Sequence, residues 1–139
     1  MGRGFFIVLE GVDGAGKSTQ ARLLAEALKQ RHYQVVLTRE PWDSPAGKKI
    51  REYLNGPCRH LTPQEELALF MADRREHVET VIRPALRQGR VVISDRYYFS
   101  SAAYQGALGL DPQWILTEHE AFALPPDLVI FLTLSPAKA

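Results

Sequence analysis

The sequence predicts an α/β fold in which helices cover both faces of a doubly wound parallel sheet, giving three αβα layers. Apolar runs of strand length alternate along the chain with segments whose apolar residues recur at helical spacing. The runs at residues 5–9, 91–94 and 128–132 show no polar alternation, which is typical of strands covered on both faces. A glycine-rich loop separates the first run from the first helical segment. The length of 139 residues fits one domain, residues 1–139.

Local signals place the elements in order along the chain. The first helix follows the glycine-rich loop to about His32, and prolines exclude regular structure between residues 39 and 45. Residues 62–65, Thr-Pro-Gln-Glu, form a capping box that begins a long helix, which Pro84 should bend before it ends near Gln88. The predicted strands are residues 5–10, 34–38, 91–94 and 128–132, and the other predicted helices are residues 46–54, 100–108 and 112–122.

The balance of charge argues against polyanionic partners. Lys and Arg number 17 against 16 Asp and Glu, so no strong field attracts a nucleic-acid polymer or an anionic membrane. The single cysteine excludes an intrachain disulfide and a multi-cysteine zinc site. The chain enters its first strand without room for a signal peptide, and residues 5–9 are too few to span a bilayer. We therefore expect a cytoplasmic protein.

The loop after the first strand has a composition suited to phosphate groups. Residues 11–18 read Gly-Val-Asp-Gly-Ala-Gly-Lys-Ser, the full GxxxxGK[ST] pattern in the strand–loop–helix context that it requires. Its glycines let backbone N–H groups point inward, Lys17 can reach the β- and γ-phosphates, and the Ser18 hydroxyl can ligate Mg²⁺. The alternative is a glycine-rich turn with a surface lysine. The residues predicted to bind a nucleoside triphosphate are Gly11, Val12, Asp13, Gly14, Ala15, Gly16, Lys17, Ser18 and Thr19.

An acid and an arginine end the third predicted strand. Asp95 follows an apolar run, and at the carboxyl end of that strand its carboxylate would lie beside the glycine-rich loop and hold Mg²⁺. The alternative is an aspartate that caps the next segment. Arg96 can fork two phosphate oxygens, although a simple ion pair with its neighbour is also open.

The long helix has an aromatic ring and a guanidinium on one face. Phe70 and Arg74 stand four residues apart. Such a pair suits a planar heterocycle, because the ring can stack while the guanidinium donates to an exocyclic oxygen. The alternative is a core phenylalanine and a solvated arginine paired with a helix neighbour, and spacing alone favours this alternative. Hydroxyl and amide groups that could contact a sugar and a base follow in residues 100–106. The four histidines show no metal-ligand spacing.

Four linked segments, residues 10–19, 38–41, 70–77 and 95–106, together resemble bacterial thymidylate kinases over essentially the whole chain. The resemblance implies a P-loop NTPase fold of the nucleoside monophosphate kinase type. It implies an enzyme that phosphorylates dTMP to dTDP, with ATP as donor and Mg²⁺ as cofactor.

The resemblance also implies a role for each matching residue. Phe70 would stack on thymine, Arg74 would donate to its carbonyl oxygen, and Tyr104 would lie beneath the deoxyribose. The implied dTMP-binding residues are Glu40, Arg51, Phe70, Arg74, Arg96, Ser101, Tyr104 and Gln105, of which Arg51 and Arg96 would hold the acceptor phosphate. The implied catalytic residues are Lys17, Arg96 and Asp13, and the implied Mg²⁺ ligands are Ser18, Asp13 and Asp95.

The chain departs from the family pattern in three places. Trp42-Asp43-Ser44 stands where Gly-Gly-Thr is frequent, which leaves open a changed pocket and a kinase for another nucleoside monophosphate. Position 14 is Gly rather than Arg, so the resemblance implies that the catalytic arginines belong to a lid. The chain stops at Ala139, before that lid and the last strand, so we expect a truncated domain with residues 128–132 as an uncovered edge.

These departures keep other functions open. A nucleotide-binding fragment with little catalysis is one alternative to an active kinase. A regulatory GTPase is disfavoured because the sequence has no Asn-Lys-x-Asp segment. Family members commonly dimerise through helices, so a homodimer is possible.

Overall fold

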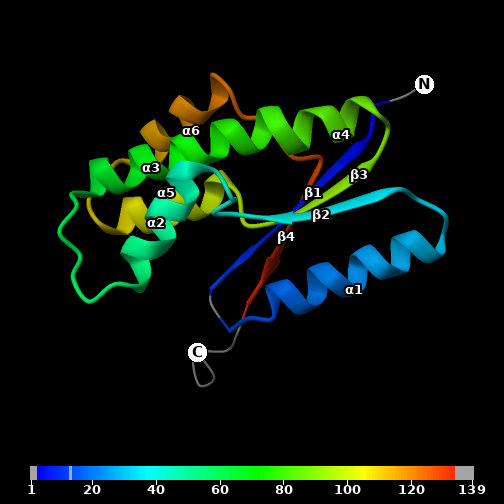
Figure 1. The fold of residues 1–139 in the computed structure, drawn as a ribbon, viewed down its shortest axis with the longest axis horizontal. Coiled ribbons are helices and arrows are strands. Elements are labelled where there is room, and N and C mark those ends of the chain that lie inside the picture. Colours follow the sequence, from blue (N-terminus) through cyan, green and yellow to red (C-terminus); the bar gives the residue numbers. More distant parts are fainter. Residues whose placement is uncertain (1–2, 13, 134–139) are drawn as a thin grey trace.

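The computed structural model describes residues 3–12 and 14–133, and the described chain forms an α/β fold around a four-stranded sheet (Figure 1). The strand order is β2-β3-β1-β4 and every neighbouring pair is parallel. This confirms the predicted fold class. The strands are β1 (Phe5–Gly11), β2 (Val35–Arg39), β3 (Val91–Asp95) and β4 (Leu128–Leu132).

Helices cover both faces of the sheet. Neighbouring residues of β1 point to opposite faces, so each face has its own core. Phe6 and Val8 pack in a core with Val92 and with residues 78–86 of the chain. Ile7 and Leu9 pack in a second core with α1 (Lys17–Gln30). In Figure 1 α1 lies on one side of the sheet and α3, α4 and α6 lie on the other, which gives the three predicted layers. The remaining helices are α2 (Pro45–Asn55), α3 (Pro63–His77), α4 (Arg83–Arg87), α5 (Tyr98–Ala107) and α6 (Pro112–Glu120).

The prediction of one helix bent at Pro84 is partly wrong. The helix begins as predicted, with Thr62 and Glu65 forming a complete capping box. A π-helical turn, η1 (Val78–Ile82), then separates α3 from α4, and the Arg83 N–H reaches back to the Val78 carbonyl. Proline has no N–H for the carbonyl four residues before it and its ring crowds that carbonyl, so a wider turn ahead of Pro84 relieves both problems.

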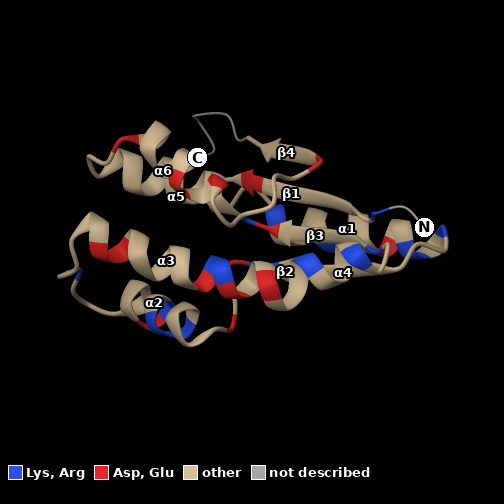
Figure 2. Ribbon diagram, turned by 90° about the horizontal axis from the view of Figure 1, so that it is seen from above, with Lys and Arg blue, Asp and Glu red and all other residues tan. Residues whose placement is uncertain are grey.

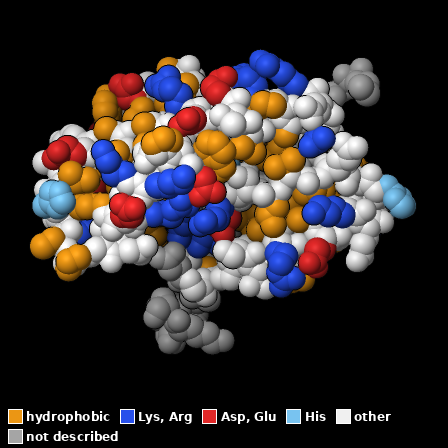
Figure 3. Space-filling view, in the orientation of Figure 1, with side chains coloured by type: hydrophobic (Ala, Val, Ile, Leu, Met, Phe, Trp, Pro, Cys, Tyr) orange, Lys and Arg blue, Asp and Glu red, His pale blue; other side chains and the backbone are white. Residues whose placement is uncertain are grey.

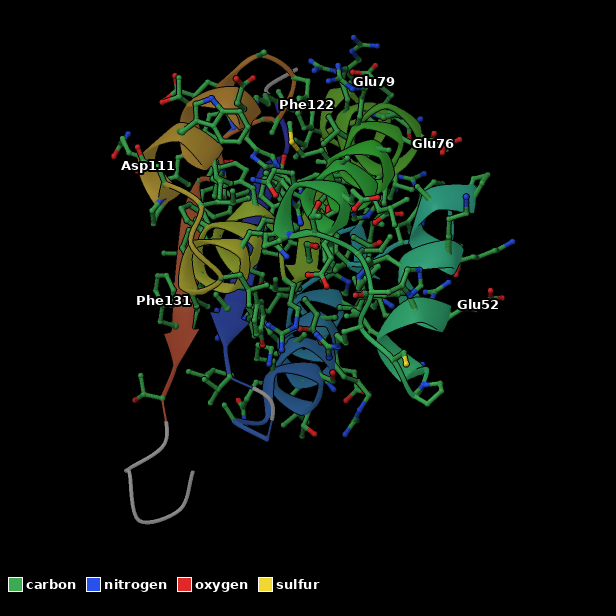
Figure 4. All side chains as sticks on the ribbon, turned by 90° about the vertical axis from the view of Figure 1, so that its left-hand side faces the viewer. Glu52, Glu76, Glu79, Asp111, Phe122 and Phe131 are labelled. Carbon is green, nitrogen blue, oxygen red and sulfur yellow. The ribbon has the colours of Figure 1, made fainter. Side chains whose placement is uncertain are left out.

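The prediction that β4 is covered on both faces holds for one face only, because Ile130 and Leu132 pack against the second core whereas Phe131 is exposed. Among the described residues β4 pairs only with β1, and it forms the edge of the sheet. Phe131 is 63% exposed, and Figure 4 shows it on the outer side of the strand. The edge position expected from the family resemblance is therefore correct, whereas the inference from the apolar run is correct for only one face of the strand.

Within the described residues no helix has the length and apolar character needed to cross a membrane.

Candidate active site

The glycine-rich loop joins β1 to α1 at the carboxyl edge of the sheet. Gly14 and Gly16 have φ angles of 85° and 89°, which is the left-handed region that glycine adopts at little cost. A Cβ atom at either position would meet nothing within 4 Å, so backbone conformation rather than crowding calls for glycine here. Asp13, a predicted catalytic residue and Mg²⁺ ligand, lies outside the described residues.

The first turn of α1 meets the end of β3. Lys17 is 6% exposed and its Nζ donates to the carbonyl of Val12 at 3.0 Å. The Ser18 hydroxyl donates to Oδ2 of Asp95 at 2.6 Å. The other carboxylate oxygen, Oδ1, is buried, and within the described part of the chain it has no hydrogen-bond partner. The structure therefore brings together two oxygen donors of the kind that Mg²⁺ prefers.

Arg96 links the loop to a neighbouring cavity. Its φ angle of 77° turns the chain sharply after β3, and its Nη1 donates to the carbonyl of Gly11 and to the Ser100 hydroxyl, both at 3.2 Å. The guanidinium lies 5.7 Å from the centre of the Tyr104 ring. Figure 3 shows Lys and Arg side chains gathered on the face near the carboxyl ends of the strands, with acidic side chains beside them.

The cavity has a volume of about 520 Å³ and lies between α3 and α5. Figure 2 shows α2 and α3 on one side of this end of the molecule and α5 and α6 on the other. Most of the predicted dTMP-binding residues line the cavity, namely Glu40, Phe70, Arg74, Arg96, Ser101, Tyr104 and Gln105. These predicted residues come from three separate segments of the sequence, and the cavity brings them together.

Arg74 is the hub of a buried polar network. It is 1% exposed, so the alternative of a solvated arginine is wrong. Its Nε donates to Oε1 of Glu40 at 2.7 Å, and its Nη1 reaches the Ser101 hydroxyl at 2.8 Å and Nε2 of His119 at 2.9 Å. Burial alone would raise the pKa of Glu40, but the Arg74 guanidinium and the His77 ring outweigh it and hold that pKa below its ordinary value.

Two further lining residues present complementary groups near Arg74. The half-buried Phe70 lies one turn earlier on α3 and faces the same cavity, as the family resemblance implies and spacing alone did not favour. Gln105 is 2% exposed, and within the described part of the chain its Oε1 has no hydrogen-bond partner. The cavity wall thus offers an aromatic surface, a guanidinium donor and an unused amide acceptor.

Comparison with known proteins assigns the chain to a family. The family model described as thymidylate kinase matches residues 9–139.

This chain belongs to the thymidylate kinase family.

It is 52% identical over 136 residues to the probable thymidylate kinase of Thermococcus kodakarensis, an alignment that covers 93% of this chain and 66% of that protein. It is 49% identical over 131 residues to the thymidylate kinase of Desulfotalea psychrophila, covering 94% and 64%. The crystal structure of thymidylate kinase from Ehrlichia chaffeensis superposes with a TM-score of 0.84 at 38% identity, covering 94% of this chain and 71% of that one. The chain thus spans about two thirds of the length of the curated relatives that it matches.

Arg51 is the predicted thymidylate kinase site residue that the structure does not bring to the cavity. Its guanidinium donates to Oδ1 of Asp43 at 2.7 Å and to the carbonyl of Pro41 at 3.2 Å, and it is absent from the described lining residues. Trp42 is absent from them too, because its ring stacks on His77 with centroids 5.5 Å apart. Trp42 therefore lies outside the described cavity wall, whereas the sequence had left open a pocket changed by this residue.

Sequence reasoning gave no role to Glu10, which organises the start of α5. Glu10 is 2% exposed; its Oε2 accepts from the backbone N–H groups of Tyr97 and Ser100 at 3.2 and 3.1 Å, and its Oε1 accepts from the Ser100 hydroxyl at 2.5 Å. Burial raises the pKa of Glu10, and these hydrogen bonds offset part of the rise. The available signal was an acid at the end of an apolar strand, directly before the thymidylate kinase glycine-rich loop.

Proposed function

We propose that residues 1–139 form a P-loop kinase domain that transfers the γ-phosphoryl group of ATP to dTMP and so makes dTDP. The observation that carries this proposal is the cavity whose wall combines Phe70, Arg74 and Gln105 and whose end, at Arg96, touches the glycine-rich loop. Membership of the thymidylate kinase family supports the same substrates.

The base would be selected by a pattern of donors and acceptors. Thymine has a ring N–H donor flanked by carbonyl acceptors, so Arg74 can donate to a carbonyl while Oε1 of Gln105, which no described residue contacts by a hydrogen bond, accepts from the N–H. Cytosine would place an amino group against the guanidinium and offer no ring N–H. We expect dCMP to be used at least about 10²-fold less efficiently than dTMP, since a mispaired buried polar group is costly.

The phosphates would meet where the cavity joins the loop. Arg96 is positioned to orient the acceptor phosphate, Tyr104 lies beside it to support the deoxyribose, and Lys17 supplies positive charge to the donor phosphates. The acceptor phosphate is largely dianionic near neutral pH because its second pKa is about 6. It therefore requires orientation and charge neutralisation rather than a general base.

The pair formed by Ser18 and Asp95 fits a Mg²⁺ ion. Oδ1 of Asp95 is buried and has no hydrogen-bond partner among residues 3–12 and 14–133, so it is available to a cation. Mg²⁺ commonly binds through one or two protein oxygens while phosphates and waters complete its shell. Asp13 would join them. Such an ion would offset the negative charge that accumulates on the phosphates during transfer.

The test is a comparison of four acceptors with ATP: dTMP, dUMP, dCMP and dGMP. We expect dTMP to give the highest kcat/KM, with dUMP only about fourfold behind, because it lacks a single buried methyl group. Equal or better turnover of dCMP or dGMP would overturn the assignment. Binding of dTMP and ATP without dTDP formation would instead indicate a nucleotide-binding protein with little catalysis.

The compartment and the oligomeric state of the protein are also part of the proposal. We propose a cytoplasmic protein that acts on free nucleotides, supported by the balanced charge and by the need for ATP. We also propose that it forms a homodimer through helices. Light scattering during size-exclusion chromatography measures this directly, and a monomeric mass at all accessible concentrations would overturn it.

A further inference from the structure

His119 lies beneath the base-recognition wall without lining the cavity. It is fully buried on α6, none of whose residues is among the described lining residues. Its ring packs near Tyr98 and Phe122, with centroids 5.4 and 5.3 Å away, and Figure 4 marks Phe122 just beyond the end of α6. Its two ring nitrogens contact Nη1 of Arg74 at 2.9 Å and the carbonyl of Ile115 at 2.8 Å.

These two contacts fix the protonation of the ring. A guanidinium has only donors, so Nε2 of His119 must accept from Arg74. A carbonyl has only acceptors, so Nδ1 must carry the proton that it donates to Ile115. The ring is therefore neutral and in the Nδ1–H tautomer. Burial and then the nearby charge of Arg74 lower the pKa of His119 to about 4, which keeps the ring neutral at physiological pH.

We propose that His119 is a positioning residue for nucleobase recognition, acting on the base through the Arg74 guanidinium. This inference rests on the proposed function, because it assumes that Arg74 contacts the base. Glu40 holds the Nε edge of the guanidinium, and this single anchor would let the plane pivot. The contacts of Nη1 with Ser101 and His119 set that plane, and only the imidazole nitrogen is restricted to accepting, since a hydroxyl can rotate.

The matched test variants are His119→Gln and His119→Asn. The glutamine amide oxygen can occupy the place of Nε2 and still accept from Arg74. The asparagine amide is one carbon shorter, so it can replace Nδ1 toward Ile115 but leaves Arg74 without its partner. Both variants put a neutral amide in the same buried site, so they share the cost of removing the ring.

The measurement is titration of dTMP into the wild-type protein and both variants, with urea unfolding as the control for folding. We expect His119→Gln to bind dTMP within about threefold of wild type and His119→Asn to bind roughly tenfold more weakly, since a hydrogen bond from a charged donor is lost. We also expect kcat at saturating dTMP to change less than KM. Equal binding by the two variants, whether strong or weak, would overturn the proposal.

A second measurement separates this inference from the proposed function. Long-range ¹H–¹⁵N correlation of the imidazole at pH 7 should show a protonated Nδ1 and an unprotonated Nε2. An Nε2–H tautomer or a doubly protonated ring would overturn the positioning role even if dTMP binds. Failure of the wild-type protein to bind dTMP, with the expected tautomer present, would overturn the proposed function and, with it, the role in base recognition.

Discussion

Acidification should destabilise this protein through one buried histidine. His119 is neutral in the folded state, and three charged groups bear on it: Arg74 and Arg75 from α3 and Glu40 from the connection after β2. Burial and the arginines lower its pKa from the ordinary 6.5 to about 4, against smaller opposing effects of the hydrogen bond to the Ile115 carbonyl and of Glu40. In the unfolded chain the ring takes up a proton near pH 6.5, whereas the folded protein resists protonation until about pH 4.

The sign and size of the effect of pH on the free energy of unfolding follow from the difference between the two pKa values of His119, 6.5 in the unfolded chain and about 4 in the folded protein. The contribution of His119 to stability is fully present above pH 6.5 and is lost as the pH falls toward about 4, because the unfolded state binds the proton first. The interval corresponds to at most about 3 kcal/mol, since each pKa unit represents about 1.36 kcal/mol. That is a large share of the 5–15 kcal/mol that is typical of a domain.

The assay is urea unfolding at several pH values between 7.5 and 4 for the wild type and for His119→Gln, which cannot titrate. Other groups titrate in both proteins, so the difference between the two curves isolates His119. We expect the wild type to lose about 3 kcal/mol relative to the variant across this range. Parallel curves would refute the reasoning, because they would mean that the folded and unfolded states bind the proton alike.

Three further substitutions probe separate parts of the site. Arg74→Lys should weaken dTMP binding roughly 10²-fold in calorimetry while changing dCMP binding far less, because an ammonium cannot replace the forked contacts of a guanidinium. An equal loss of affinity for both nucleotides would contradict this. Asp95→Asn should lower the rate of phosphoryl transfer by about 10²-fold or more while dTMP affinity stays within about threefold of wild type. If the rate and the dTMP affinity fell by the same factor, Asp95 would belong to the acceptor site instead. Gly11→Ala should destabilise the fold by about 2–4 kcal/mol in urea, since its Cβ would lie 2.5 Å from the carbonyl oxygen of Leu132; a change within about 0.5 kcal/mol would rule out that close approach.

Local signals in the sequence were enough for most of the fold. The capping box at Thr62, the glycine-rich loop and the apolar run of β3 each depend on residues adjacent in the chain, and each appears in the structure where it was expected. The edge position of β4 was not visible in this way. Its run of five apolar residues resembles that of a buried strand, and only the order of strands in the sheet distinguishes the two.

The site was predictable as a set of residues but not as a network. Spacing placed Phe70 and Arg74 on one helix face, but only the family resemblance implied that they share a binding cavity. The burial of Arg74 did not, because two of its partners, Ser101 and His119, lie 27 and 45 residues away in sequence. Spacing on a single helix treats an arginine as solvated unless such distant groups are known.

The turn of α3 that contains Arg74 also ties α2 to the site, and this connection can be tested at Gly47. The preceding residue, Asp73, is 1% exposed and accepts from the Trp42 N–H at 2.7 Å and from the Ser44 hydroxyl at 2.6 Å. A Cβ atom on Gly47 would collide with the carbonyl oxygen of Trp42 and with the Asp73 carboxylate, so α2 approaches this turn too closely for any side chain.

Substitution at Gly47 therefore sets two effects against each other. Alanine in a helix gains up to about 1 kcal/mol over glycine, whereas overpacking against backbone and a buried carboxylate costs about 1–3 kcal/mol or more. We expect Gly47→Ala to destabilise the protein in urea by about 2 kcal/mol. Gly56→Ala at the end of the same helix is the matched control, because its nearest atoms lie at an ordinary 3.4 Å, and it should change stability by less than about 0.5 kcal/mol. If both variants were equally stable, α2 would not be packed closely against Asp73. The segment between β2 and α2, which contains Glu40, would then not be held in place by that packing.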